Sequence, residues 1–222
     1  MTNVAEIRRG FAAADLLASA VRLVSGTIAE ESAMKCLENE SLLLRVRESA
    51  FDCYLMRGEL CARRGLCASG ADGWTWPIVV IESGWALGAI QGRGRTHYFP
   101  RAILPQIARA SEGVQFRRRH PLKYERDFEL AAGWLSNARV EGHSVRANVI
   151  LFKREDALRA ALFAAREDKR LDLFGISIMG DFRFQQRVID GRPAPVATSV
   201  EKLDGVDLVC DGAAGGHFLG SS

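Results

Sequence analysis

The chain lacks the features that mark membrane, secreted and zinc-binding proteins. None of its apolar runs approaches the roughly 20 residues that a membrane-spanning helix needs, and the run at residues 77–81 has the length of a strand. Its five cysteines contain no Cys-x-x-Cys pair and are odd in number, which favours reduced thiols over a disulfide framework or a zinc site. The first residues show no signal-peptide pattern. We therefore expect no membrane partner, no cofactor and no metal.

A one-sided charge is also lacking. The 30 Lys and Arg residues against 27 Asp and Glu residues leave a formal net charge of +3, which argues neither for nor against nucleic acid. The basic loop at residues 91–95 has no Gly-Lys-Ser/Thr that would make it a phosphate-binding loop, so we interpret it as a solvated loop. A nucleic-acid-binding module using residues 92–95 and 117–119 stays open as an alternative. Aromatic residues that could stack on bases are not interleaved with those arginines, so nucleic acid is not the expected partner.

The pattern of the chain changes near residue 73. Before it, apolar residues recur at a spacing of three to four, which predicts helices, the second of them from about Glu30 to Met56. The cluster Ser69–Gly73 is typical of a break between units. We therefore place a helical N-terminal extension at residues 1–73 and a second domain at residues 74–222.

The second domain is expected to be rich in short strands. Alternating or continuous apolar runs bounded by turn residues predict them. The expected strands are 77–81, 85–90, 114–116, 131–140, 143–152, 172–180, 182–188, 196–203 and 206–210, and the expected helices are 101–110 and 154–169.

Two residues in this domain could act together in nucleophilic catalysis. Ser177 lies in an apolar run flanked by Gly175 and Gly180, and a hydroxyl there must find a partner or take part in chemistry. His120 precedes Pro121, which favours an extended backbone at the histidine. A free imidazole titrates near neutrality and is the usual general base for a serine nucleophile.

Asp207 is a carboxylate inside the apolar run Val206–Val209. Buried acids are rare unless they are paired, and the partner could be an arginine or a histidine that needs orientation. The residues leave both possibilities open. The arginines at 117–119 would disfavour an imidazolium at His120 if they pointed towards it.

Five blocks follow one another in a characteristic order between about Trp76 and Leu219. In this order they resemble the prohead (procapsid) maturation proteases of tailed bacteriophages, which are distant relatives of herpesvirus assemblin. One departure from the family pattern is Gly212, where the closing motif usually has proline. The blocks are Gly92–Leu104 (aromatic-Pro-x-x-x-Leu), Phe116–Pro121 (a strand ending in His-Pro), Ala131–Leu135 with Val140–Gly142 (a hairpin), Gly175–Ile178 (the nucleophile strand), and Val206–Val209 with Ala213–Gly216 (the closing strand and tail).

The resemblance implies an α+β fold, namely a closed, mainly antiparallel β-barrel flanked by helices, as in assemblin. It also implies a serine endopeptidase in which Ser177 is the nucleophile and His120 the general base. An acid near the closing strand would be the third member, and Asp207 fits best, with Asp204 and Glu201 as alternatives. Backbone N–H groups would form the oxyanion hole, and the glycine-rich segment after residue 211 could supply them.

The family's substrates are the phage scaffold protein and an N-terminal part of the major capsid protein. By resemblance, this chain would cleave them inside the assembling prohead in the host cytoplasm, and would also cleave itself. A homo-oligomer is left open. The alternatives are a catalytically inactive shell or scaffold component with the same fold, in which Ser177 is a core hydroxyl, and a cysteine hydrolase built on Cys210.

Overall fold

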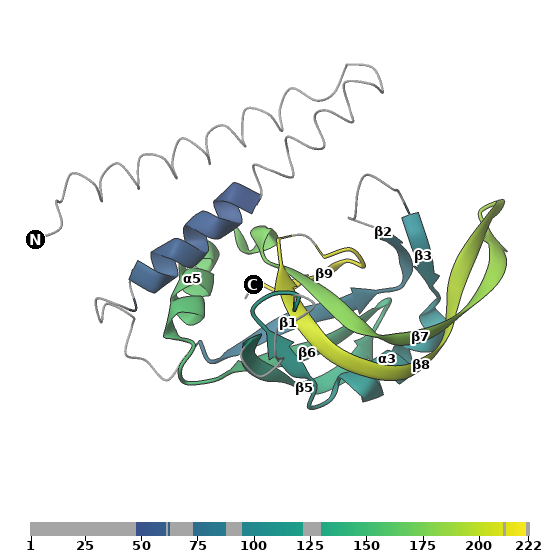
Figure 1. Cartoon of the computed structure of the whole chain (residues 1–222), viewed down its shortest axis with the longest axis horizontal. Helices are drawn as coiled ribbons and strands as arrows, with labels where there is room; N and C mark the ends of the chain where they lie inside the picture. The colour runs from purple at the N-terminus through teal and green to yellow at the C-terminus, as the bar shows by residue number, and fades with distance from the viewer. Residues whose placement is uncertain are drawn as a thin grey trace, which may run out of the picture.

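The computed structural model describes residues 48–60, 62, 73–87, 95–121, 130–210 and 212–220. Within these residues seven strands close into a mixed β-barrel flanked by three helices, an α+β fold (Figure 1). The strand order around the barrel is β8-β4-β5-β6-β1-β9-β7, and β7 returns to β8. The barrel strands are β1 (Thr75–Glu82), β4 (Gln115–Arg117), β5 (Ala131–Glu141), β6 (Ser144–Leu151), β7 (Gly175–Ile189), β8 (Arg192–Val209) and β9 (Gly216–Phe218).

The predicted closed barrel in an α+β fold is confirmed. Around the described barrel every neighbouring pair is antiparallel except β4 with β8, which run parallel. Two further strands, β2 (Gly84–Leu87) and β3 (Arg95–Phe99), form a hairpin that joins β8 through the parallel pair Tyr98 and Val196. Residues 88–90 of the expected strand 85–90 lie outside the described residues.

Helices cover the barrel where the sequence predicts them. The 3₁₀-helix η1 (Arg101–Ile103) leads into α3 (Leu104–Ser111), and α5 (Asp156–Glu167) leads to η2 (Leu171–Leu173). Along α5 the buried residues recur at helical spacing, so that one stripe packs on the core. No helix in the described part of the chain is long and apolar enough to cross a membrane.

The prediction of four short strands between residues 172 and 210 is wrong, because this region forms two long strands. β7 and β8 pair over their whole length and project from the barrel as a long arm (Figure 1). Register shifts after Met179, Asp181 and Arg183 absorb the irregular pattern, since a β-bulge adds a residue without ending the ladder. Asp190 and Gly191 connect the two strands, and both residues have positive φ, as a tight hairpin requires.

Residues 48–60 form a helix that lies beside α5 (Figure 1). The Phe51 ring lies 5.1 Å from that of Phe174, and the Tyr54 hydroxyl donates to Asp168 at 2.9 Å. Burial, and next the hydrogen bond to Asp168, raise the pKa of Tyr54 to about 12. The described end of the N-terminal region is therefore packed on the barrel. The helices expected before residue 48 lie outside the described residues, and the boundary at residue 73 stays a prediction.

Candidate active site

The three neighbouring strands β4, β8 and β7 each place one residue side by side on the same face of the sheet. Asp207 on β8 is paired in register with Ser177 on antiparallel β7 and with Arg117 on parallel β4. The preceding residues Phe116 and Val206 point into the hydrophobic core. Because side chains alternate along a strand, Arg117, Asp207 and Ser177 share the opposite face of the sheet.

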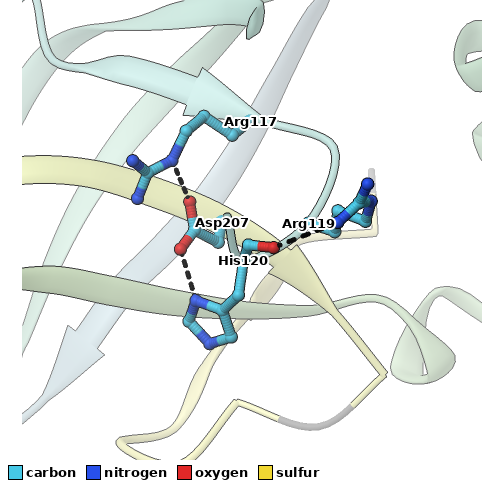
Figure 2. Close-up of polar contacts among 4 residues, drawn as sticks. All are labelled: Arg117, Arg119, His120 and Asp207. Carbon is cyan, nitrogen blue, oxygen red and sulfur yellow. Dashed lines mark hydrogen bonds and ion pairs between the residues drawn. The ribbon is translucent and has the colours of Figure 1, made fainter. Parts of the chain in front are cut away.

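Asp207 is the centre of this row. Its side chain has no exposed surface, and neither has that of Arg117. Oδ1 accepts a hydrogen bond from Arg117 Nε at 2.5 Å, while Oδ2 lies 2.5 Å from His120 Nδ1 (Figure 2). A buried carboxylate is tolerated when it is paired and hydrogen-bonded. The sequence left open whether its partner is an arginine or a histidine, and the structure provides both.

His120 follows β4 by three residues and folds back over Asp207. An ionised carboxylate can only accept, so this contact requires the proton of a neutral imidazole on Nδ1. The ring's other nitrogen, Nε2, is then the one that can accept a proton from a nucleophile. The side chain is 52% exposed, so substrate can reach it.

The arginine next to Arg117 fixes the segment that carries His120. Arg118 donates from Nε and Nη2 to the two carboxylate oxygens of Glu155, at 2.8 and 2.6 Å, and its backbone N–H donates to Leu130 at 3.0 Å. Glu155 is 3% exposed and occupies the N-cap position of α5 without a side-chain capping hydrogen bond. The hydrogen bonds to Glu155 raise the pKa of Arg118 above its ordinary value. The chain between β4 and His120 is thus tied to a helix on one side and to β8 on the other.

Ser177 is half-buried and lies directly across the ladder from Asp207. The Cβ atoms of such a pair are about 4.5–5.5 Å apart. Ser177 and His120 therefore flank the same carboxylate. Among the described residues no hydrogen bond joins the Ser177 hydroxyl to His120, so the contact between nucleophile and base stays a prediction. Such contacts are often loose in free enzymes and tighten with substrate.

The glycine-rich tail lies against the strand that carries Ser177. Gly216 on β9 pairs with Ile176, the residue before Ser177. A Cβ atom at Gly216 would lie 2.4 Å from the Ile176 carbonyl oxygen, and one at Gly212 would lie 2.6 Å from it. Only glycine permits this approach. The departure from the family's proline at residue 212 therefore matches the local packing, and the tail remains a candidate source of oxyanion donors.

The residues considered as alternatives to Asp207 and Ser177 make other contacts. Glu201 pairs with Arg183 and Asp204 with Lys202. Cys210 directly follows β8 and is not part of a disulfide among the described residues.

Two arginines of the run at residues 117–119 are committed to acids within the protein. Arg117 is fully buried against Asp207, and Arg118 holds Glu155 through two hydrogen bonds. The run is therefore weak support for a nucleic-acid surface. Residues 92–94 of the other basic segment lie outside the described residues.

Sequence reasoning missed the role of Arg117 as the partner of Asp207, and with it the role of Gly205. A signal was present: Arg117 directly follows the expected strand 114–116, and a buried acid in another strand needs a cation. Gly205 lies two residues before Asp207 and so on the same face of β8. What the sequence could not supply was the parallel pairing of β4 with β8 that brings these residues together.

Comparison of the chain with protein-family models, with curated proteins and with solved structures finds no match.

Proposed function

We propose that the chain is a serine hydrolase that works by acyl transfer. Ser177 attacks the scissile carbonyl while His120 Nε2 takes its proton and later gives that proton to the leaving amine. Asp207 accepts a hydrogen bond from His120 Nδ1–H and so fixes the tautomer and the orientation of the imidazole ring. The observation that carries this proposal is a fully buried carboxylate that contacts His120 Nδ1 at 2.5 Å and lies in register with Ser177.

More narrowly, we propose an endopeptidase of the prohead-maturation type. The order of the five sequence blocks supports this step, and the closed barrel with flanking helices agrees with the fold that the resemblance implies. The proposed substrates are the scaffold protein and an N-terminal part of the major capsid protein, cleaved inside the prohead in the host cytoplasm. Self-cleavage belongs to the same proposal.

A fluorophosphonate probe tests the chemistry without a known substrate. It reacts with serines that a neighbouring base activates, and intact-mass analysis counts the adducts. We expect one adduct on the purified full chain and none on the Ser177→Ala or His120→Ala variant. Ser136→Ala and His143→Ala are the matched controls, because they remove the same groups elsewhere in the barrel domain. Labelling that persists in Ser177→Ala, or no labelling of a folded wild-type chain, would contradict the proposal.

Co-expression tests the substrate. The chain or its Ser177→Ala variant is produced with the scaffold and capsid proteins encoded beside it, and all masses are measured. Discrete truncated products that disappear with Ser177→Ala would support the maturation role. Identical masses in both samples, with shells assembled normally, would overturn it.

The second candidate is an inactive shell or scaffold component with the same fold. The observation that favours it is the missing hydrogen bond between Ser177 and His120 among the described residues. The same probe separates the two candidates, because an inactive component would leave every serine unlabelled.

A further inference from the structure

The buried pair of Arg117 and Asp207 does more than neutralise a charge. A carboxylate bound only to His120 could rotate about its Cβ–Cγ bond and offer either oxygen or neither. In this site Arg117 Nε donates a hydrogen bond to Asp207 Oδ1 at 2.5 Å, and Asp207 Oδ2 faces the imidazole of His120 (Figure 2). The guanidinium therefore fixes the orientation of the group that orients the base.

Arg117 can reach Asp207 because β8 carries a glycine at the adjacent position on the same face. A Cβ atom at Gly205 would lie 2.4 Å from both Cζ and Nη2 of Arg117, and 2.7 Å from Nε. The guanidinium thus occupies the space that any other residue at 205 would fill. The φ of Gly205 is not in the left-handed region, so the lack of a side chain is what matters here.

Charge supports the same role. A carboxylate removed from water needs a compensating cation. If His120 were the only partner, the buried carboxylate would have no permanent cation beside it. Arginine stays protonated at every working pH, so Arg117 supplies the charge permanently and leaves the imidazole free to act as a base.

We propose that Arg117 is a positioning residue that acts through Asp207 on His120, and that Gly205 provides the space it needs. The catalytic part of this inference depends on the proposed function. The effect on the imidazole does not, because it concerns the ground state of the folded protein.

The test is the ¹⁵N NMR spectrum of the His120 imidazole, recorded at pH 8 on the full chain. The two nitrogen shifts report which nitrogen carries the proton. We expect the Nδ1–H tautomer in the wild type and a loss of this preference in Arg117→Met and Gly205→Ala. Arg117→Lys should restore it in part, because lysine keeps the charge but lacks the planar fork. Arg183→Met is the control, because Arg183 pairs with Glu201 on exposed parts of β7 and β8, and it should leave the shifts unchanged.

The rate of fluorophosphonate labelling is the second measurement. We expect it to fall about tenfold to a hundredfold in Arg117→Met and Gly205→Ala, since small misplacements of catalytic groups have effects of that size. Wild-type nitrogen shifts in both folded variants would overturn the positioning role. If Arg117→Met does not fold, Gly205→Ala and Arg117→Lys still decide the matter.

The two readouts separate this inference from the proposed function. Shifts that change as expected, in a protein whose Ser177 is never labelled, would support the positioning role and contradict the hydrolase. Labelling of Ser177 with unchanged shifts in the variants would support the hydrolase and contradict the positioning role.

Discussion

At the scale of residues, two buried carboxylates, Asp207 and Glu155, hold the site in place. Asp207 holds Arg117 and His120, while Glu155 holds Arg118, so each side of the short segment after β4 is tied to a buried carboxylate. A buried acid is strongly dependent on its partners, because each lost hydrogen bond leaves a desolvated charge. Two such acids therefore fix the position of His120 although its own side chain is half exposed.

Glu155→Gln tests this dependence. The amide keeps the shape of the side chain but can accept only one of the two charge-assisted hydrogen bonds from Arg118. We expect the free energy of unfolding to fall by roughly 1–3 kcal/mol, and labelling of Ser177 to slow as the segment carrying His120 loosens. Urea unfolding and the probe rate measure the two effects.

Glu141→Gln is the control for that substitution. Glu141 also pairs with two arginines, Arg139 and Arg146, but all three side chains are partly exposed. Its loss should cost at most about 1 kcal/mol and leave the labelling rate unchanged. Equal losses in both variants would contradict the role given to Glu155.

Local pattern and the resemblance point to Ser177, His120 and Asp207 as candidate residues, and their catalytic roles stay a prediction. The structure places Asp207 beside both of the others. The contact between Arg117 and Asp207 could not be derived in this way. It joins residues 90 positions apart through a parallel pairing, and no local pattern specifies which strands become neighbours.

At the scale of elements, the expected ranges of strands and helices were correct mainly where the apolar residues follow one spacing along the whole element. The hairpin of β5 and β6 and the helix α5 lie close to their expected ranges. The apolar residues of β6 and α5 follow one period, and the register shift between Ser136 and Arg139 in β5 does not end the ladder. β7 and β8 were divided wrongly, because glycines and charges at their centres resemble turns. Bulges keep those residues within the ladder, and a bulge depends on the partner strand rather than on local sequence.

Gly58 gives a prediction at this scale. Alanine normally stabilises a helix by roughly 1 kcal/mol relative to glycine. Here a Cβ atom would lie 2.1 Å from the Ala157 carbonyl oxygen and 2.9 Å from the Ala161 backbone nitrogen, so it would push the helix of residues 48–60 off α5. We therefore expect Gly58→Ala to destabilise the protein by about 1–3 kcal/mol, the opposite sign to helix propensity.

Thermal unfolding of Gly58→Ala measures this effect. Met56→Ala on the exposed face of the same helix is the control, and it should change stability by less than about 0.5 kcal/mol. A stabilised Gly58→Ala would show that the two helices do not pack closely in solution.

At the scale of the whole molecule, the structure bears on where the folded unit begins. The barrel supplies the site, since β4, β7 and β8 are all barrel strands. The helix of residues 48–60 packs Phe51, Tyr54 and Leu55, all partly buried, against the hydrophobic core, although the sequence assigned this helix to an extension ending at residue 73. A unit that includes this helix buries more apolar surface than the barrel domain alone, which favours it as the smallest stable form.

Two truncations test this last point. A chain starting at residue 48 keeps the helix, whereas a chain starting at residue 73 loses it and uncovers Phe174, whose ring it contacts. We expect the second chain to be less stable than the first by roughly 3–5 kcal/mol, because three apolar side chains lose their burial. The measurement is chemical unfolding of both chains with Ser177 labelling in parallel. Equal stability would place the helix outside the folded unit and support the boundary at residue 73. A loss of stability with labelling retained at low temperature would show that the helix stabilises a barrel which by itself holds the complete site.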